Sequence, residues 1–69
     1  MELNEAKHHI LEFTKKKEYE ALCVYVNSEI DRLHKRMEEV REPYEIGKLQ
    51  GCIKILRQML QLEKEVINL

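Results

Sequence analysis

The residues that could carry chemistry in this 69-residue chain include three histidines, and their spacing does not assemble a metal site. His8 and His9 are adjacent, so on a helix their side chains point about 100° apart and cannot bind one ion together. A metal-binding helix instead places its ligands three or four residues apart, as in H-E-x-x-H. We therefore favour a surface role for His8, His9 and His34, and we expect no metal and no cofactor.

The two cysteines do not form a disulfide scaffold or a catalytic pair. Cys23 and Cys52 lie in apolar helical patterns, where a free thiol behaves as a small hydrophobic residue, so we expect a reducing compartment. The predicted helix pairing separates them by about 15 Å, too far for a disulfide. Cys52 and His34 fall at one level of that pairing, but no third group is available to orient them. The sequence predicts a protein that is not an enzyme.

The apolar side chains between residues 44 and 67 form two seams on one predicted helix. The first seam, with spacings of three and four, is Ile46, Leu49, Ile53, Leu56 and Leu60. The second seam lies beside it and is Cys52, Ile55, Met59, Leu62 and Val66. A single neighbouring helix covers one seam, so this helix is expected to contact at least two neighbours.

Residues 18–42 form the preceding predicted helix and carry a matching seam, which is Tyr19, Cys23, Val26, Ile30, Leu33, Met37 and Val40. Pro43 ends or kinks this helix and suits the first position of the next one. Folding the two helices together pairs their seams level by level, as Val40 with Ile46, Met37 with Leu49, Leu33 with Ile53, Ile30 with Leu56, and Val26 with Leu60. The pattern predicts an antiparallel helical hairpin, about 18–42 and 44–67.

A short N-terminal helix, residues 1–14, is predicted from the apolar spacing of Leu3, Ala6, Ile10 and Phe13. Lys15 to Lys17 interrupt the pattern, and a continuous helix through this point is the alternative. We therefore predict an all-α fold and one small domain, 1–69, with the hairpin occupying 18–67. The first helix could cover part of the second seam, and a second subunit could cover the rest.

The charge and hydropathy of the chain argue against nucleic acid and membrane as its partners. Twelve basic and 13 acidic residues leave a net charge of −1, which argues against a nucleic-acid-binding protein. The longest apolar run, Ala21 to Val26, is far too short for a membrane span, and the N-terminus lacks a secretory signal. The chain begins at Met1, and we expect a complete small reading frame. The expected partner is a protein, through self-association or a larger assembly.

The only glycines, Gly47 and Gly51, lie four residues apart inside the last predicted helix. Each destabilises a helix interior by about 1 kcal/mol relative to alanine. At Gly51 we expect another helix to approach closely, since that is what a missing Cβ allows. At Gly47, close approach and relaxation of the preceding turn both remain open.

Most of the chain from Phe13 onward lies in three stretches, which are F-T-K-K-K-E-Y-E-A-L, I-D-R-L-x-K-R-M and E-P-Y-E-I-G-K-L-Q-G-C-I-K-I-L-R-Q-M-L-Q-L. In these stretches the chain resembles a group of short phage-encoded helical proteins. The return helix of the group reads roughly L-Q-G-x-I-x-x-L-x-x-L-L-x-L, which is matched by Leu49, Gln50, Gly51, Ile53, Leu56, Met59, Leu60 and Leu62. The chain departs from the group in having Cys52 after the glycine and few prolines near its end.

The resemblance implies a coiled hairpin associated with the head and tail assembly genes of tailed phages. It also implies that Gln50 makes a hydrogen bond across the helix contact, with a solvent-facing position as the alternative. The function expected is a non-enzymatic helical interaction protein, a phage structural or assembly component in the virion or a head–tail accessory. Its predicted interface is Gly47, Gln50, Gly51, Cys52, Ile55, Met59, Leu62 and Val66. The alternative is a small phage effector that inhibits or redirects a host protein, and the expected location is the host cytoplasm or the virion.

Overall fold

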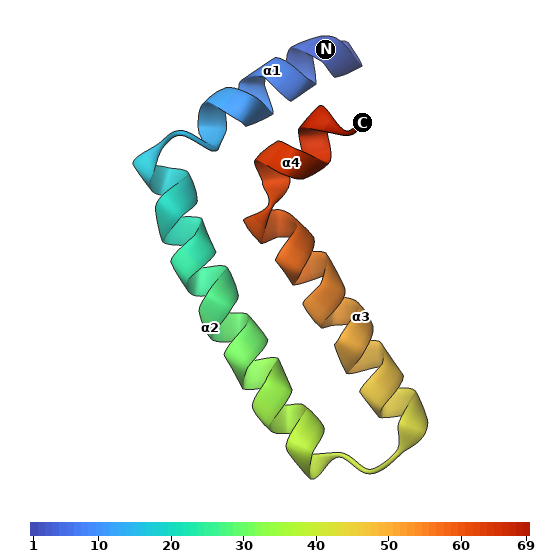
Figure 1. The fold of residues 1–69 in the computed structure, drawn as a ribbon. Helices are drawn as coiled ribbons and strands as arrows, with labels where there is room; N and C mark the ends of the chain where they lie inside the picture. The colour runs from blue at the N-terminus through green and yellow to red at the C-terminus, as the bar shows by residue number, and fades with distance from the viewer.

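The computed structural model describes residues 1–69 and contains helices only, which are α1 (Leu3–Phe13), α2 (Lys17–Glu39), α3 (Pro43–Leu60) and α4 (Leu62–Ile67). The long helices α2 and α3 lie antiparallel, and the short helices α1 and α4 lie side by side at their open end (Figure 1). The predicted all-α class, and the hairpin preceded by a short helix, are confirmed.

The core of the molecule lies between α2 and α3, where the two apolar seams meet. Its buried side chains are Val26, Ile30, Leu33, Leu49 and Ile53. Partly buried side chains packed against it are Leu22, Met37, Val40, Leu56 and Leu60. Every residue of the five predicted pairs except Ile46 therefore belongs to this core, and Ile46 itself is half-buried next to the turn.

The turn between α2 and α3 is closed by Glu42 and Pro43. Glu42 has the extended backbone that a following proline favours, with φ −81° and ψ 122°. Its carboxylate accepts hydrogen bonds from the backbone N–H groups of Tyr44 (3.1 Å) and Glu45 (2.9 Å), which would otherwise have no partner in the helix. Pro43 occupies the first turn of α3, where a missing N–H is harmless.

The break between α1 and α2 falls at residues 14–16. The hydroxyl of Thr14 donates to the carbonyl of Leu11 at 2.7 Å and closes the last turn of α1. Lys15 and Lys16 are exposed, and α2 begins at Lys17. The predicted interruption is confirmed, and the alternative of a continuous helix is wrong.

The return arm is not a single helix to residue 67, so that part of the prediction is wrong. The chain leaves helical geometry at Gln61, with φ −115° and ψ 35°, and α4 begins at Leu62. No glycine or proline lies near this bend, so its cause is not local. The hydroxyl of Tyr19 donates to the Met59 carbonyl (2.6 Å) and accepts from the Leu62 N–H (3.3 Å). Beyond the bend, α4 packs against α1.

The molecule is elongated for its length. Its radius of gyration is 14.8 Å and its extents are 44 × 23 × 17 Å. A compact chain of this length would have a radius of gyration of about 11 Å. The molecule is elongated because α2 and α3 are long and each buries only one seam against the other. The short pair α1 and α4 lies at one end of this hairpin (Figure 1).

Candidate protein-interaction surface

The outer face of α3 is a largely apolar surface with no helix of the chain packed against it; it consists of Gly47, Gly51, Cys52, Ile55 and Met59, and the exposed Lys48 lies beside them as its one charged residue. Four of these residues follow each other at spacings of four, so they lie one above another on the helix. Ile55 is 61% exposed and Met59 is 36% exposed. Because α2 already packs on Leu49 and Ile53, which point the other way, α2 cannot cover this face.

The two glycines of the outer face adjoin open space. A methyl group placed on Gly47 or on Gly51 would meet no atom within 4 Å other than those of its chain neighbours and of the backbone of its own helix. The expected close approach at Gly51 therefore does not occur within this chain, and the intramolecular form of that prediction is wrong. A close approach by another chain stays a prediction.

The C-terminal part of the predicted second seam is covered by the chain itself. Val66 is only 4% exposed and Leu62 is half-buried. Both belong to α4, which packs against α1, so the expected covering of part of the second seam by the first helix is confirmed. Val66 is consequently not available to an outside partner, and the exposed part of the seam ends at Met59.

Gln50 lies on a different side of α3 from the outer face. It lines a polar groove of about 510 Å³ along the hairpin, together with His34, Met37, Ile53, Lys54, Arg57, Gln58 and Gln61. The permanently charged side chains in this lining, Lys54 and Arg57, are both basic. None of the side-chain hydrogen bonds in the structure involves Gln50, so the expected cross-helix bond is not formed within the chain. His34 lines the groove and Cys52 does not, so these two residues do not share a site.

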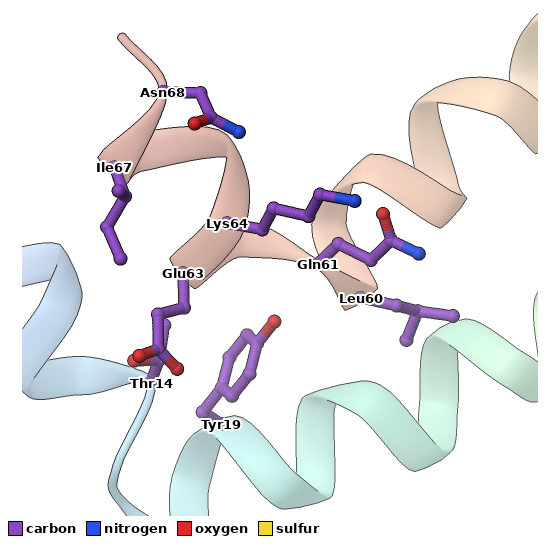
Figure 2. A pocket seen from close by; sticks show the side chains of 8 residues that line it. All are labelled: Thr14, Tyr19, Leu60, Gln61, Glu63, Lys64, Ile67 and Asn68. Carbon is purple, nitrogen blue, oxygen red and sulfur yellow. The ribbon is translucent and has the colours of Figure 1, made fainter.

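A second hollow, the end pocket, has a volume of about 540 Å³ and opens where the bend between α3 and α4 meets α2. Figure 2 shows its lining, which is Thr14, Tyr19, Leu60, Gln61, Glu63, Lys64, Ile67 and Asn68. The ring of Tyr19 points from α2 toward the bend (Figure 2). Burial raises the pKa of this phenol above its ordinary value of 10.0, against the smaller lowering effect of the Leu62 N–H bond.

Tyr19 is a residue whose position could be predicted from the sequence, but whose hydrogen bonds could not. Its position in the seam of the second helix was predicted, whereas its bonds to two backbone groups 40 and 43 residues away were not. The hydroxyl is the only signal in the sequence, because a tyrosine in an apolar seam needs a partner for its O–H when it is buried. That requirement does not identify the partner.

No three histidine, cysteine, aspartate or glutamate side chains gather into a group that could hold a metal ion. None of the four helices has both the length and the apolar content needed to cross a lipid bilayer. Comparison of the chain with protein-family models, curated proteins and solved structures finds no match.

Proposed function

We propose that this chain is a non-enzymatic helical interaction protein that docks on another protein through the outer face of α3. The observation that carries the proposal is the exposure of Ile55 on a helix whose opposite side is already packed. Covering a large aliphatic side chain is worth about 1.5–3 kcal/mol. A contact that covers Ile55, Met59 and Cys52 together would therefore gain several kcal/mol before the costs of association.

The assembly we propose for it is that of a tailed phage, with the protein in the virion or at a head–tail accessory position. The resemblance of the chain from Phe13 onward to short phage-encoded hairpin proteins supports this choice of setting. Two long paired helices also give an elongated body with extents of 44 × 23 × 17 Å, which suits a part that positions larger proteins.

The test is mass spectrometry of purified particles from the phage that encodes the chain. The proposal expects the protein in the particles, or in an assembly intermediate, at a fixed ratio to a major structural protein. Ile55→Glu should reduce that ratio strongly, because it puts a charge into the docking contact. Gln50→Glu is the matched control, since it adds the same charge to the same helix on the groove side and should leave the ratio unchanged.

A different result would favour the host-directed alternative. If the protein is absent from particles and intermediates, and instead purifies with one host protein in an Ile55-dependent manner, it is an effector. If Ile55→Glu changes neither kind of association, the outer face of α3 is not a docking surface.

A further inference from the structure

We infer that the outer face of α3 is occupied by the outer face of α3 from a second copy of this chain, in an antiparallel contact with two-fold symmetry. This inference rests on the proposed function, because it names the partner of the same surface. It also specifies how the two copies are arranged, so that each exposed side chain of one copy lies at a defined position on the other.

The single chain leaves a large surface area exposed for its mass. Its accessible surface is 5694 Å² for a mass of 8.3 kDa. A compact monomer of that mass exposes about 4,600 Å², so the excess is about 1,100 Å². Each partner in a standard protein–protein interface buries about 800 Å². One copy of the chain therefore exposes an excess comparable with what a stable dimer contact covers.

Along the outer face of α3, small residues come first and large residues follow. From the N-terminal end, the spacing-of-four row reads Gly47, Gly51, Ile55 and Met59. In a two-fold contact, if residue i meets residue j, then j also meets i. An antiparallel pairing centred between Gly51 and Ile55 sets Ile55 at the level of Gly51 of the second copy and Met59 at the level of its Gly47. Each large side chain then shares its level with a residue that lacks a Cβ and beside which the chain itself leaves open space.

In the same antiparallel register, the residues beside the Gly47–Met59 row also lie near compatible residues of the second copy. Tyr44, which is 68% exposed at the start of α3, approaches the far end of α3 in the second copy. Lys48 meets Gln58 of the second copy and so faces a neutral amide. Pairing through the polar groove would instead bring Lys54 and Arg57 of both copies together, which like-charge repulsion disfavours. Pairing through the outer face keeps like charges apart, because the two copies of Lys48 lie about 15 Å from each other along the axis.

The test is sedimentation equilibrium of the full chain over a range of concentrations, with far-UV circular dichroism alongside. Wild type is expected to reach twice 8.3 kDa. Ile55→Glu and Gly51→Leu are each expected to weaken the dimer by about a hundredfold or more while helicity is kept, because one buries an unpaired charge and the other fills the required space. Gln50→Glu is expected to leave the dimer intact.

Cross-linking tests the direction of the pairing. In a Cys23→Ser variant, the remaining Cys52 thiols of the two copies lie about 3 Å apart along the helix axis, so a short bismaleimide should link them. A Cys23→Ser, Cys52→Ser, Lys48→Cys variant should not cross-link, because the antiparallel register separates its thiols by about 15 Å along the axis. Cross-linking of this second variant would show a parallel contact and overturn the inferred geometry.

Failure of this inference and failure of the proposed function give different results. A wild-type chain that stays monomeric at every concentration overturns the two-fold contact. If Ile55→Glu still abolishes association with the phage assembly in that case, the docking function stands with a different occupant. A dimer that persists in Ile55→Glu overturns the contact as well, whatever the result with particles.

Discussion

Gly51 makes α3 less stable than alanine would at the same position, and no contact within the folded chain compensates for this loss. Glycine costs about 1 kcal/mol relative to alanine in a helix interior. The open space around it means that no neighbouring atom of this chain excludes a methyl group. The proposed intermolecular role would explain that cost, and mutation can separate it from the helix effect.

In the Ile55→Glu background, which is expected to be monomeric, Gly51→Ala should raise the free energy of unfolding by about 0.5–1 kcal/mol. The gain comes from the lower backbone entropy of alanine in the unfolded chain, with no clash in the folded one. Urea unfolding followed by circular dichroism measures it. A loss of stability in this monomeric background would mean that part of the chain does pack against Gly51.

Ile53 and Ile55 make a matched pair of one residue type on one helix. Ile53 is 4% exposed in the core, whereas Ile55 is 61% exposed. Ile53→Ala should cost about 2–5 kcal/mol, and Ile55→Ala in dilute solution should change stability by no more than about 0.5 kcal/mol. Thermal melts at low protein concentration compare the two. Equal losses would place both isoleucines inside the folded monomer.

At the level of the elements, the hairpin could be predicted and the bend could not. Five seam positions in α2 pair with five in α3 in one register, and Pro43 marks the turn, so local and long-range signals point to the same structure. Around Gln61 the sequence contains only good helix formers, and its local preference is to continue the helix. The bend depends on Tyr19 and α1, which are distant in sequence, so tertiary contacts override propensity there.

Tyr19→Phe should loosen the bend and leave the hairpin folded. It removes the bond donated to the Met59 carbonyl and the one accepted from the Leu62 N–H, each worth about 0.5–1.5 kcal/mol. Hydrogen exchange measured by NMR should show faster exchange in α4 and at the end of α3. Amides of the core residues Ile30 and Ile53 should keep their protection. Loss of protection across the whole chain would instead show that the bend is required for the hairpin.

The same bend should be sensitive to alkaline pH. The pKa of Tyr19 is raised above 10.0 in the folded chain, mainly by burial, so folding favours the protonated phenol. Its contribution to stability is fully present below pH 10 and is lost as the pH rises through the higher folded value. Exchange in α4 should therefore speed up above pH 10 beyond the intrinsic rate change. Tyr19→Phe, which cannot ionise, should lack this extra change.

At the scale of the whole molecule, the sequence indicated how many apolar surfaces exist but not which partner covers each one. The spacing of apolar residues predicted the second seam, which includes both Val66 and Ile55. In the structure, however, Val66 is buried and Ile55 is exposed. Val66 is buried because α4 turns toward α1, and Ile55 is exposed because α3 does not. The bend divides one continuous sequence pattern into an internal part and an external part, and the bend itself has no local signature.

If the proposed docking is right, protein covers the outer face of α3 when the molecule is assembled. Hydroxyl-radical footprinting of the unmodified chain at low and high concentration measures this coverage. We expect Ile55 and Met59 to be protected several-fold at high concentration, whereas Met1, which is 87% exposed and distant from the face, keeps its oxidation rate. Unchanged oxidation of Ile55 and Met59 in an assembled species, or protection confined to the polar groove around His34 and Met37, would contradict it.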